Sequence, residues 1–112
     1  MNFFKNNGFY KATRITGPTH NLLGLAFYES HEESSSICIE IGTDHHPISN
    51  VDLNFLKNKV LEGVLRANKE FRTNCSVARI QIVANDSLPI EIYEELAYAI
   101  VRRLAQEEKF PE

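Results

Sequence analysis

The chain has 112 residues, of which 43% are apolar and 24% are charged, so composition and length predict one soluble globular domain spanning residues 1–112. The longest apolar run, Leu22 to Tyr28, is far shorter than the ~20 residues that cross a membrane, and residues 1–7 lack the apolar core of a signal peptide, which favours a cytoplasmic protein. The two cysteines, Cys38 and Cys75, form no CxxC pair, which argues against a thioredoxin-type or zinc-knuckle protein.

The first third of the chain has the apolar pattern of β-strands. Residues 9–15 alternate in character, residues 22–28 are apolar on both faces, and residues 37–41 place three isoleucines on one face. Turn chemistry at residues 16–19 and a polar loop at residues 29–35 separate these segments. Because the connections are short, we expect the three strands to form an antiparallel meander with residues 22–28 in a central position.

The second half of the chain combines two helical patterns with one more strand. Apolar residues recur at spacings of three and four from Leu53 to Phe71, which predicts a long amphipathic helix. Residues 77–84 predict a fourth strand, with Ile80 and Ile82 facing inward. Pro89 suits the first turn of a second helix, whose early glutamates and late arginines complement the helix dipole.

The element order βββαβα predicts an α+β fold. We expect a two-layer sandwich in which two helices cover one face of a mostly antiparallel, four-stranded sheet. The other face of the sheet is predicted to be partly open and to be a natural place for a partner. Its expected residues include Tyr10, Arg14, Cys38, Glu40, Arg79 and Gln81.

The charges are distributed unevenly along the chain, whose formal net charge is −3. Residues 15–56 contain no lysine or arginine, but they hold six carboxylates and all four histidines. The other 70 residues carry twelve basic and nine acidic side chains, so a window of net charge −6 stands beside a remainder of net charge +3. A long stretch of one sign can attract and orient a basic partner.

The triplet Asp44-His45-His46 is the sharpest local cluster of chemically active side chains. Histidine and carboxylate ligands suit zinc, manganese or iron, with further ligands from His20, His31 or the loop glutamates. The spacing matches no metal-binding signature, and the favoured interpretation of the triplet is a solvated loop just before a helix N-terminus, where Asp44 is also favoured electrostatically. Protonation of the four histidines would change the window from −6 to −2, so a pH-sensing role is a further alternative.

Other chemistries find little support in the sequence. There is no nucleophile elbow, no phosphate-binding glycine loop and no aromatic-basic pattern for nucleic acid. We therefore assign no catalytic residue, no metal, no cofactor and no nucleic-acid partner.

The hypothesis that these observations favour is a non-enzymatic binding protein whose acidic surface covers a basic, nuclease-like cleft of another protein. Charge pairing of this kind gives fast, oriented association. The residues expected to contact the partner are the carboxylates and neighbouring histidines of the acidic window: Glu29, His31, Glu32, Glu33, Glu40, Asp44, His45, His46 and Asp52. In size, acidity, α+β build and absence of catalytic motifs, the chain resembles the small bacterial immunity proteins that neutralise toxin domains in contact-dependent competition.

Two alternatives from other functional classes stay open at this point. One is a structural or adaptor subunit that self-associates through the open sheet face or an edge strand. The other is a small metal-dependent enzyme that uses the loop of Asp44, His45 and His46.

Overall fold

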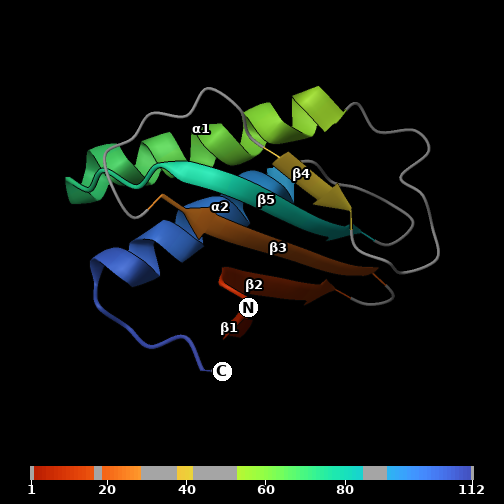
Figure 1. The fold of residues 1–112 in the computed structure, drawn as a ribbon, viewed down its shortest axis with the longest axis horizontal. Coiled ribbons are helices and arrows are strands. Elements are labelled where there is room, and N and C mark those ends of the chain that lie inside the picture. The colour runs from red at the N-terminus through yellow and green to blue at the C-terminus, as the bar shows by residue number, and fades with distance from the viewer. Residues whose placement is uncertain (1, 17–18, 29–37, 42–52, 85–90, 112) are drawn as a thin grey trace.

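A computed structural model describes residues 2–16, 19–28, 38–41, 53–84 and 91–111 of the chain (Figure 1). The elements are five strands and two helices in the order β1 (Asn2–Asn6), β2 (Phe9–Thr16), β3 (Thr19–Phe27), β4 (Cys38–Ile41), α1 (Leu53–Phe71), β5 (Val77–Ala84) and α2 (Glu91–Ala105). The predicted α+β class and the order βββαβα are confirmed from β2 to α2. None of the helices in the described ranges is both long and apolar enough to cross a membrane.

The strands pair in the order β1-β2-β3-β5-β4. In the predicted meander the strand at residues 37–41 would lie next to β3, whereas in the structure β5 occupies that place and β4 lies beyond it. The β1–β2, β2–β3 and β3–β5 pairs are antiparallel, whereas β4 runs parallel to β5 at the sheet edge. Parallel neighbours need a long crossover, and α1 supplies it between β4 and β5. The central position predicted for residues 22–28 is confirmed, because β3 lies between β2 and β5.

The strand β1 was not predicted from the sequence. It pairs with β2 from Asn2↔Thr13 to Asn6↔Phe9, through a tight turn at Asn7 and Gly8. These two residues have φ angles of 53° and 82°, as a two-residue hairpin of the Asn-Gly type requires. The Asn7-Gly8 dipeptide is a signal in the sequence from which this hairpin could have been predicted.

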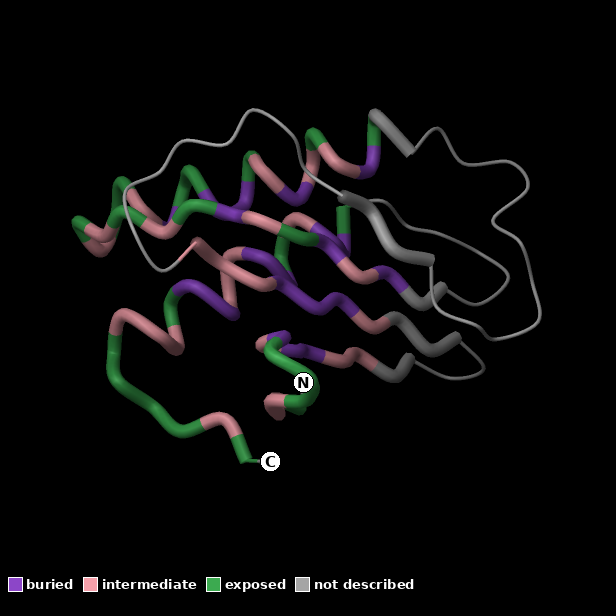
Figure 2. Tube along the Cα trace, in the orientation of Figure 1, coloured by how far each residue is buried: buried purple, intermediate pink, exposed green. Residues whose placement is uncertain are grey.

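Both helices lie on one side of the sheet, and the core lies between the two layers (Figure 1). Buried residues run along β3, β5 and the inner sides of the helices (Figure 2). The sheet contributes Ala12, Leu23, Leu25, Ile80 and Ile82, and the helices contribute Leu56, Val60, Val64, Tyr93, Leu96 and Ile100.

The predicted open face was wrong for two of its residues. Tyr10 and Arg14 alternate with Phe9 and Lys11 along β2, and they share the side of the fully buried Ala12. Arg14 accordingly reaches Glu95 of α2, with 2.8 Å between Nη1 and Oε2. The apolar Phe9 suggests the opposite assignment from sequence, but Ala12 packs on Leu23 and fixes which side of β2 faces the helices.

The two helices are in close contact at Gly63. A Cβ atom at this position would collide with the backbone carbonyl oxygen of Glu94 and lie 3.1 Å from the Cβ of Ala97. Because neither obstacle is a flexible side-chain end, only glycine allows this contact between α1 and α2.

We expect Gly63→Ala to lower the free energy of unfolding by about 2 kcal/mol, because overpacking at a rigid contact outweighs the gain in helix propensity. Chemical denaturation measures this change. The control is Leu65→Ala on the outer side of the same helix, where the side chain is 66% exposed, and its effect should stay within about 0.5 kcal/mol. Equal effects of the two substitutions would contradict the proposed close contact.

Candidate functional site

The residues predicted to contact a partner fall mainly in two segments, residues 29–37 and 42–52, that lie outside the described ranges. This holds for Glu29, His31, Glu32, Glu33, Asp44, His45, His46 and Asp52. Glu40 lies within β4, where it pairs in register with Gln81 of β5. The fold therefore places one of the nine predicted residues, and the convergence of the others stays a prediction.

The strand β4 forms one end of the five-stranded sheet. It begins at Cys38, where residues 29–37 end, and it finishes at Ile41, where residues 42–52 begin. Both acidic segments are thus attached to the same four-residue strand. The opposite end of the sheet is β1, on the far side of β2, β3 and β5.

The sheet face turned away from the helices carries an unusual row of residues. In register across the sheet, Phe4 pairs with Lys11, Lys11 with Gly24, Gly24 with Gln81, and Gln81 with Glu40. Gly24 leaves room for its neighbours, because a Cβ there would lie 3.3 Å from both Gln81 Oε1 and Lys11 Cγ. The Gln81 Oε1 atom is buried and accepts no hydrogen bond from the described residues.

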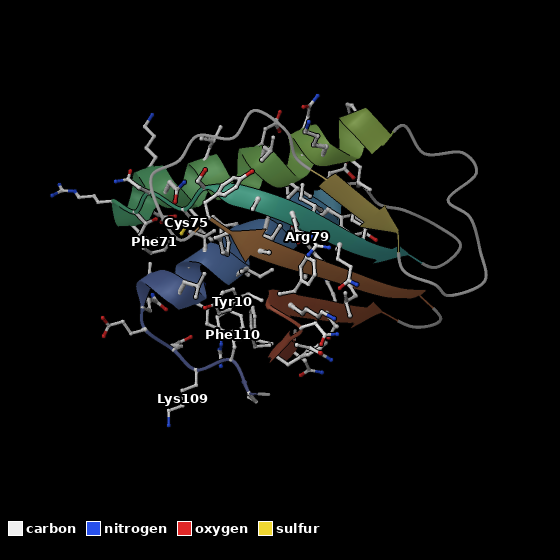
Figure 3. All side chains as sticks on the ribbon, viewed as in Figure 1. Tyr10, Phe71, Cys75, Arg79, Lys109 and Phe110 are labelled. Carbon is white, nitrogen blue, oxygen red and sulfur yellow. The ribbon has the colours of Figure 1, made fainter. Side chains whose placement is uncertain are left out.

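Two cationic side chains, those of Lys11 and Arg79, lie near the ring of Phe9 on this face. Lys11 is only 9% exposed, and its Nζ atom lies 6.0 Å from the Phe9 ring centroid and 5.8 Å from that of Phe4. The Arg79 guanidinium lies 5.1 Å from the Phe9 centroid, on the side away from α2 (Figure 3). Arg79 and Gln81 thus occupy the open face, as predicted from the sequence.

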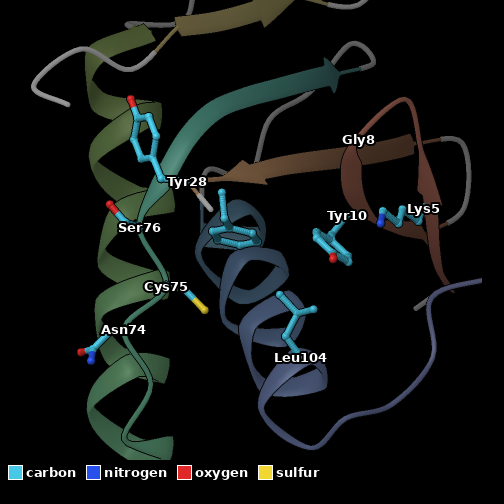
Figure 4. Close-up of a pocket in the computed structure, with 9 residues that line it drawn as sticks. Lys5, Gly8, Tyr10, Tyr28, Asn74, Cys75, Ser76 and Leu104 are labelled. Atoms are coloured by element: carbon cyan, nitrogen blue, oxygen red, sulfur yellow. The ribbon is translucent and has the colours of Figure 1, made fainter. Parts of the chain in front are cut away.

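A separate hollow lies on the helix side, where the β1–β2 hairpin, the end of β3 and the α1–β5 loop meet the last turns of α2 (Figure 4). Its volume is about 510 Å³. It is lined by apolar, aromatic and a few polar side chains, namely Lys5, Gly8, Tyr10, Phe27, Tyr28, Asn74, Cys75, Ser76 and Leu104. We call this hollow the Lys5 pocket.

The side chain of Asn68 holds the α1–β5 loop in place beside this pocket. Its Oδ1 atom accepts hydrogen bonds from Thr73 Oγ1 at 2.8 Å and from the Cys75 amide at 3.0 Å, while its Nδ2 atom donates to the Cys75 carbonyl at 3.0 Å. The Tyr28 amide donates to the Ser76 carbonyl at 3.0 Å, which joins the end of β3 to the same loop. The wall that carries Cys75 is therefore fixed from two elements.

Aromatic rings and one ammonium group form the opposite wall of the Lys5 pocket. The ring of Tyr10 lies against that of Phe110, with centroids 4.9 Å apart (Figure 3), and its centroid is 6.0 Å from that of Phe27. The Lys5 Nζ atom lies 5.0 Å from the Tyr10 ring centroid. Burial raises the pKa of the Cys75 thiol, against a smaller opposing effect of its hydrogen bond with Thr73, so this thiol is protonated at neutral pH.

The described residues contain no group of three histidine, cysteine, aspartate or glutamate side chains that could hold a metal ion. The alternative metal loop of Asp44, His45 and His46 lies outside those ranges. The Lys5 pocket was also hard to predict from the sequence, because its walls come from five separate segments. The Asn7-Gly8 turn was the one local signal, since it places β1 and hence Lys5.

Comparisons with protein-family models, with curated proteins and with solved structures found no match to this chain. The resemblance to immunity proteins thus stays a prediction.

We expect Lys11→Met to leave the free energy of unfolding unchanged or to raise it by about 1 kcal/mol. Within the described residues Lys11 has no acidic partner, and replacing buried ionic groups by apolar ones of similar length is often neutral or stabilising. The matched control is Lys59→Met on α1, where a surface pair with Glu62 at 3.4 Å contributes little. Chemical denaturation compares the two variants, and a loss above about 2 kcal/mol for Lys11→Met would reveal a strong polar partner.

Proposed function

We propose that this protein is a non-enzymatic, cytoplasmic binding protein, an immunity-type inhibitor whose acidic window neutralises a basic, nuclease-like toxin domain. The observation that carries the proposal is the separation of charge along the chain. Residues 15–56 hold six carboxylates and neither lysine nor arginine. The topology supports the proposal, since Glu40 lies in the edge strand β4 and both acidic segments are attached to its two ends.

A basic cleft that recognises phosphates presents several lysine and arginine side chains in a small area. A protein that offers clustered carboxylates satisfies the same cations and excludes the nucleic acid from them. Attraction between the two surfaces accelerates encounter, while close apolar and hydrogen-bonded contacts determine the rate of dissociation. Neutralisation of this kind needs no reaction and is consistent with a chain that shows no catalytic motif.

The test begins with the full chain, purified with its stoichiometric partner from the source cell, and with measurement of association by stopped-flow at several salt concentrations. We expect a basic partner and an association rate that falls steeply with salt. The triple variant Glu32→Lys, Glu33→Lys and Glu40→Lys should associate at least about tenfold more slowly, because steering is lost.

The matched control reverses the same number of charges outside the window, with Glu62→Lys, Glu91→Lys and Glu107→Lys. All three side chains are exposed, and the change in net charge is identical. Equal slowing by both triple variants would assign the effect to net charge alone and would contradict a binding surface in the acidic window. A stoichiometric partner that is itself acidic would contradict the proposal as well.

A further inference from the structure

The Lys5 pocket is a second feature of the molecule that is suited to a ligand, and it is independent of the acidic window. We propose that it binds a small aromatic monocarboxylate. The carboxylate pairs with the Lys5 ammonium, and the ring packs against Tyr10 and Phe27.

The size of the pocket fits this class of ligand. Its volume of about 510 Å³ lies within the range of about 300–1,000 Å³ that is typical of small-molecule sites. Such sites combine apolar walls with a few polar groups that fix orientation. Here Phe27, Leu104 and the protonated thiol of Cys75 provide apolar surface, and Figure 4 shows the sulfur turned toward the hollow.

The charge of the pocket selects for an anion. Among the described residues that line it, Lys5 is the one that carries a charge, and none is aspartate or glutamate. Within the described residues the Lys5 ammonium forms no ion pair, and its ring contact is with Tyr10 at 5.0 Å. Lys5 is a partly buried residue, and an ammonium beside apolar surface attracts a carboxylate more strongly than a fully hydrated one, since the local dielectric constant is lower.

The geometry favours an aromatic monoanion over a phosphate. One ammonium balances a single negative charge, whereas phosphate sites bring together several donors. The ring of Tyr10 already contacts Phe27 and Phe110 in tilted and edge-on arrangements, so a further ring extends an existing aromatic cluster. A ligand that carries its acid on an aromatic ring matches the short separation between Lys5 and this cluster.

The walls of the pocket are fixed before any ligand arrives. Gly8 adopts a φ angle of 82°, which favours glycine, and this holds the hairpin that carries Lys5. The amide of Lys5 donates to the Pro111 carbonyl at 2.8 Å, so the C-terminal segment braces the same strand. Asn68 fixes the opposite wall. A site with walls fixed in this way loses little conformational freedom on binding.

The experiment uses two probes with the same ring and nearly the same shape, the anion 2-naphthoate and its neutral amide 2-naphthamide. The chain contains no tryptophan, so naphthalene fluorescence reports binding to the full protein without tryptophan background. We expect 2-naphthoate to bind at least about tenfold more tightly than 2-naphthamide, as a charge-assisted hydrogen bond warrants. Lys5→Gln should remove that difference and leave the affinity for 2-naphthamide unchanged.

The matched control is Lys109→Gln, which makes the same change in net charge at an exposed residue outside the pocket. Its affinities for both probes should equal those of the parent chain. A second readout is alkylation of Cys75 by iodoacetamide, followed peptide by peptide so that Cys38 is scored separately. Bound 2-naphthoate should slow the modification of Cys75 and leave that of Cys38 unaltered.

A third variant, Cys75→Leu, tests the cavity rather than the charge. The larger side chain fills part of the pocket and should weaken both probes alike, with an unchanged far-ultraviolet circular dichroism spectrum. Equal affinities of the parent chain for the two probes would overturn the proposal. So would an unchanged preference for 2-naphthoate in Lys5→Gln, or absence of Cys75 protection at saturating probe.

Discussion

The antiparallel pairing of β3 with β5 is the interaction on which the rest of the molecule depends. Leu23 pairs with Ile82 and Leu25 with Ile80, and all four side chains are fully buried beneath the helices. At about 25 cal/mol per Å² of apolar surface, four such residues stabilise the fold by several kcal/mol. Because β5 lies beside β3, the strand β4 pairs with the outer side of β5 and so forms the sheet edge. The crossover helix α1 connects β4 to β5. The position of Glu40 therefore follows from a contact between apolar residues.

The same sheet separates two chemically different surfaces. The side that faces the helices is apolar in the middle and ends in the Lys5 pocket. The opposite side carries Lys11, Gln81 and Arg79 around the ring of Phe9. Gly24 is central to this second surface because its missing side chain lets Lys11 and Gln81 approach each other across β3. Successive side chains of a strand point to opposite faces of the sheet. Alternate residues therefore pack in the core, while the residues between them form the polar row on the other face.

The elements of this fold could be predicted from the sequence, whereas their arrangement in space could be predicted only in part. The helical spacing from Leu53 to Phe71 and the alternation around Ile80 and Ile82 are local patterns, and the structure confirms both elements. Strand order depends on which partner satisfies the two apolar faces of β3, and residues 37–41 and 77–84 fit that role equally well by pattern. The assignment of Tyr10 to the open face was wrong for a related reason. Phe9 and Ala12 are both apolar but lie on opposite faces of β2, so the apolar pattern alone does not show which face meets the helices. The candidate site is harder still, since most of its acidic residues lie outside the predicted helices and strands, in segments that carry no periodic signal.

The order of the strands also bears on whether the two proposed sites can coexist. Four strand spacings of about 4.8 Å separate β1 from β4, so roughly 19 Å lies between the strand of Lys5 and the strand of Glu40. This exceeds the Debye length of about 8 Å at physiological ionic strength. Charges on the two edge strands therefore act on each other little through space. Had β4 joined β3 in a meander, with β5 outside it, Glu40 would have moved one spacing closer to Lys5. By inserting β5 between β3 and β4, the fold places the strands of Lys5 and Glu40 at opposite edges of one sheet, which is consistent with two proposed sites that act independently.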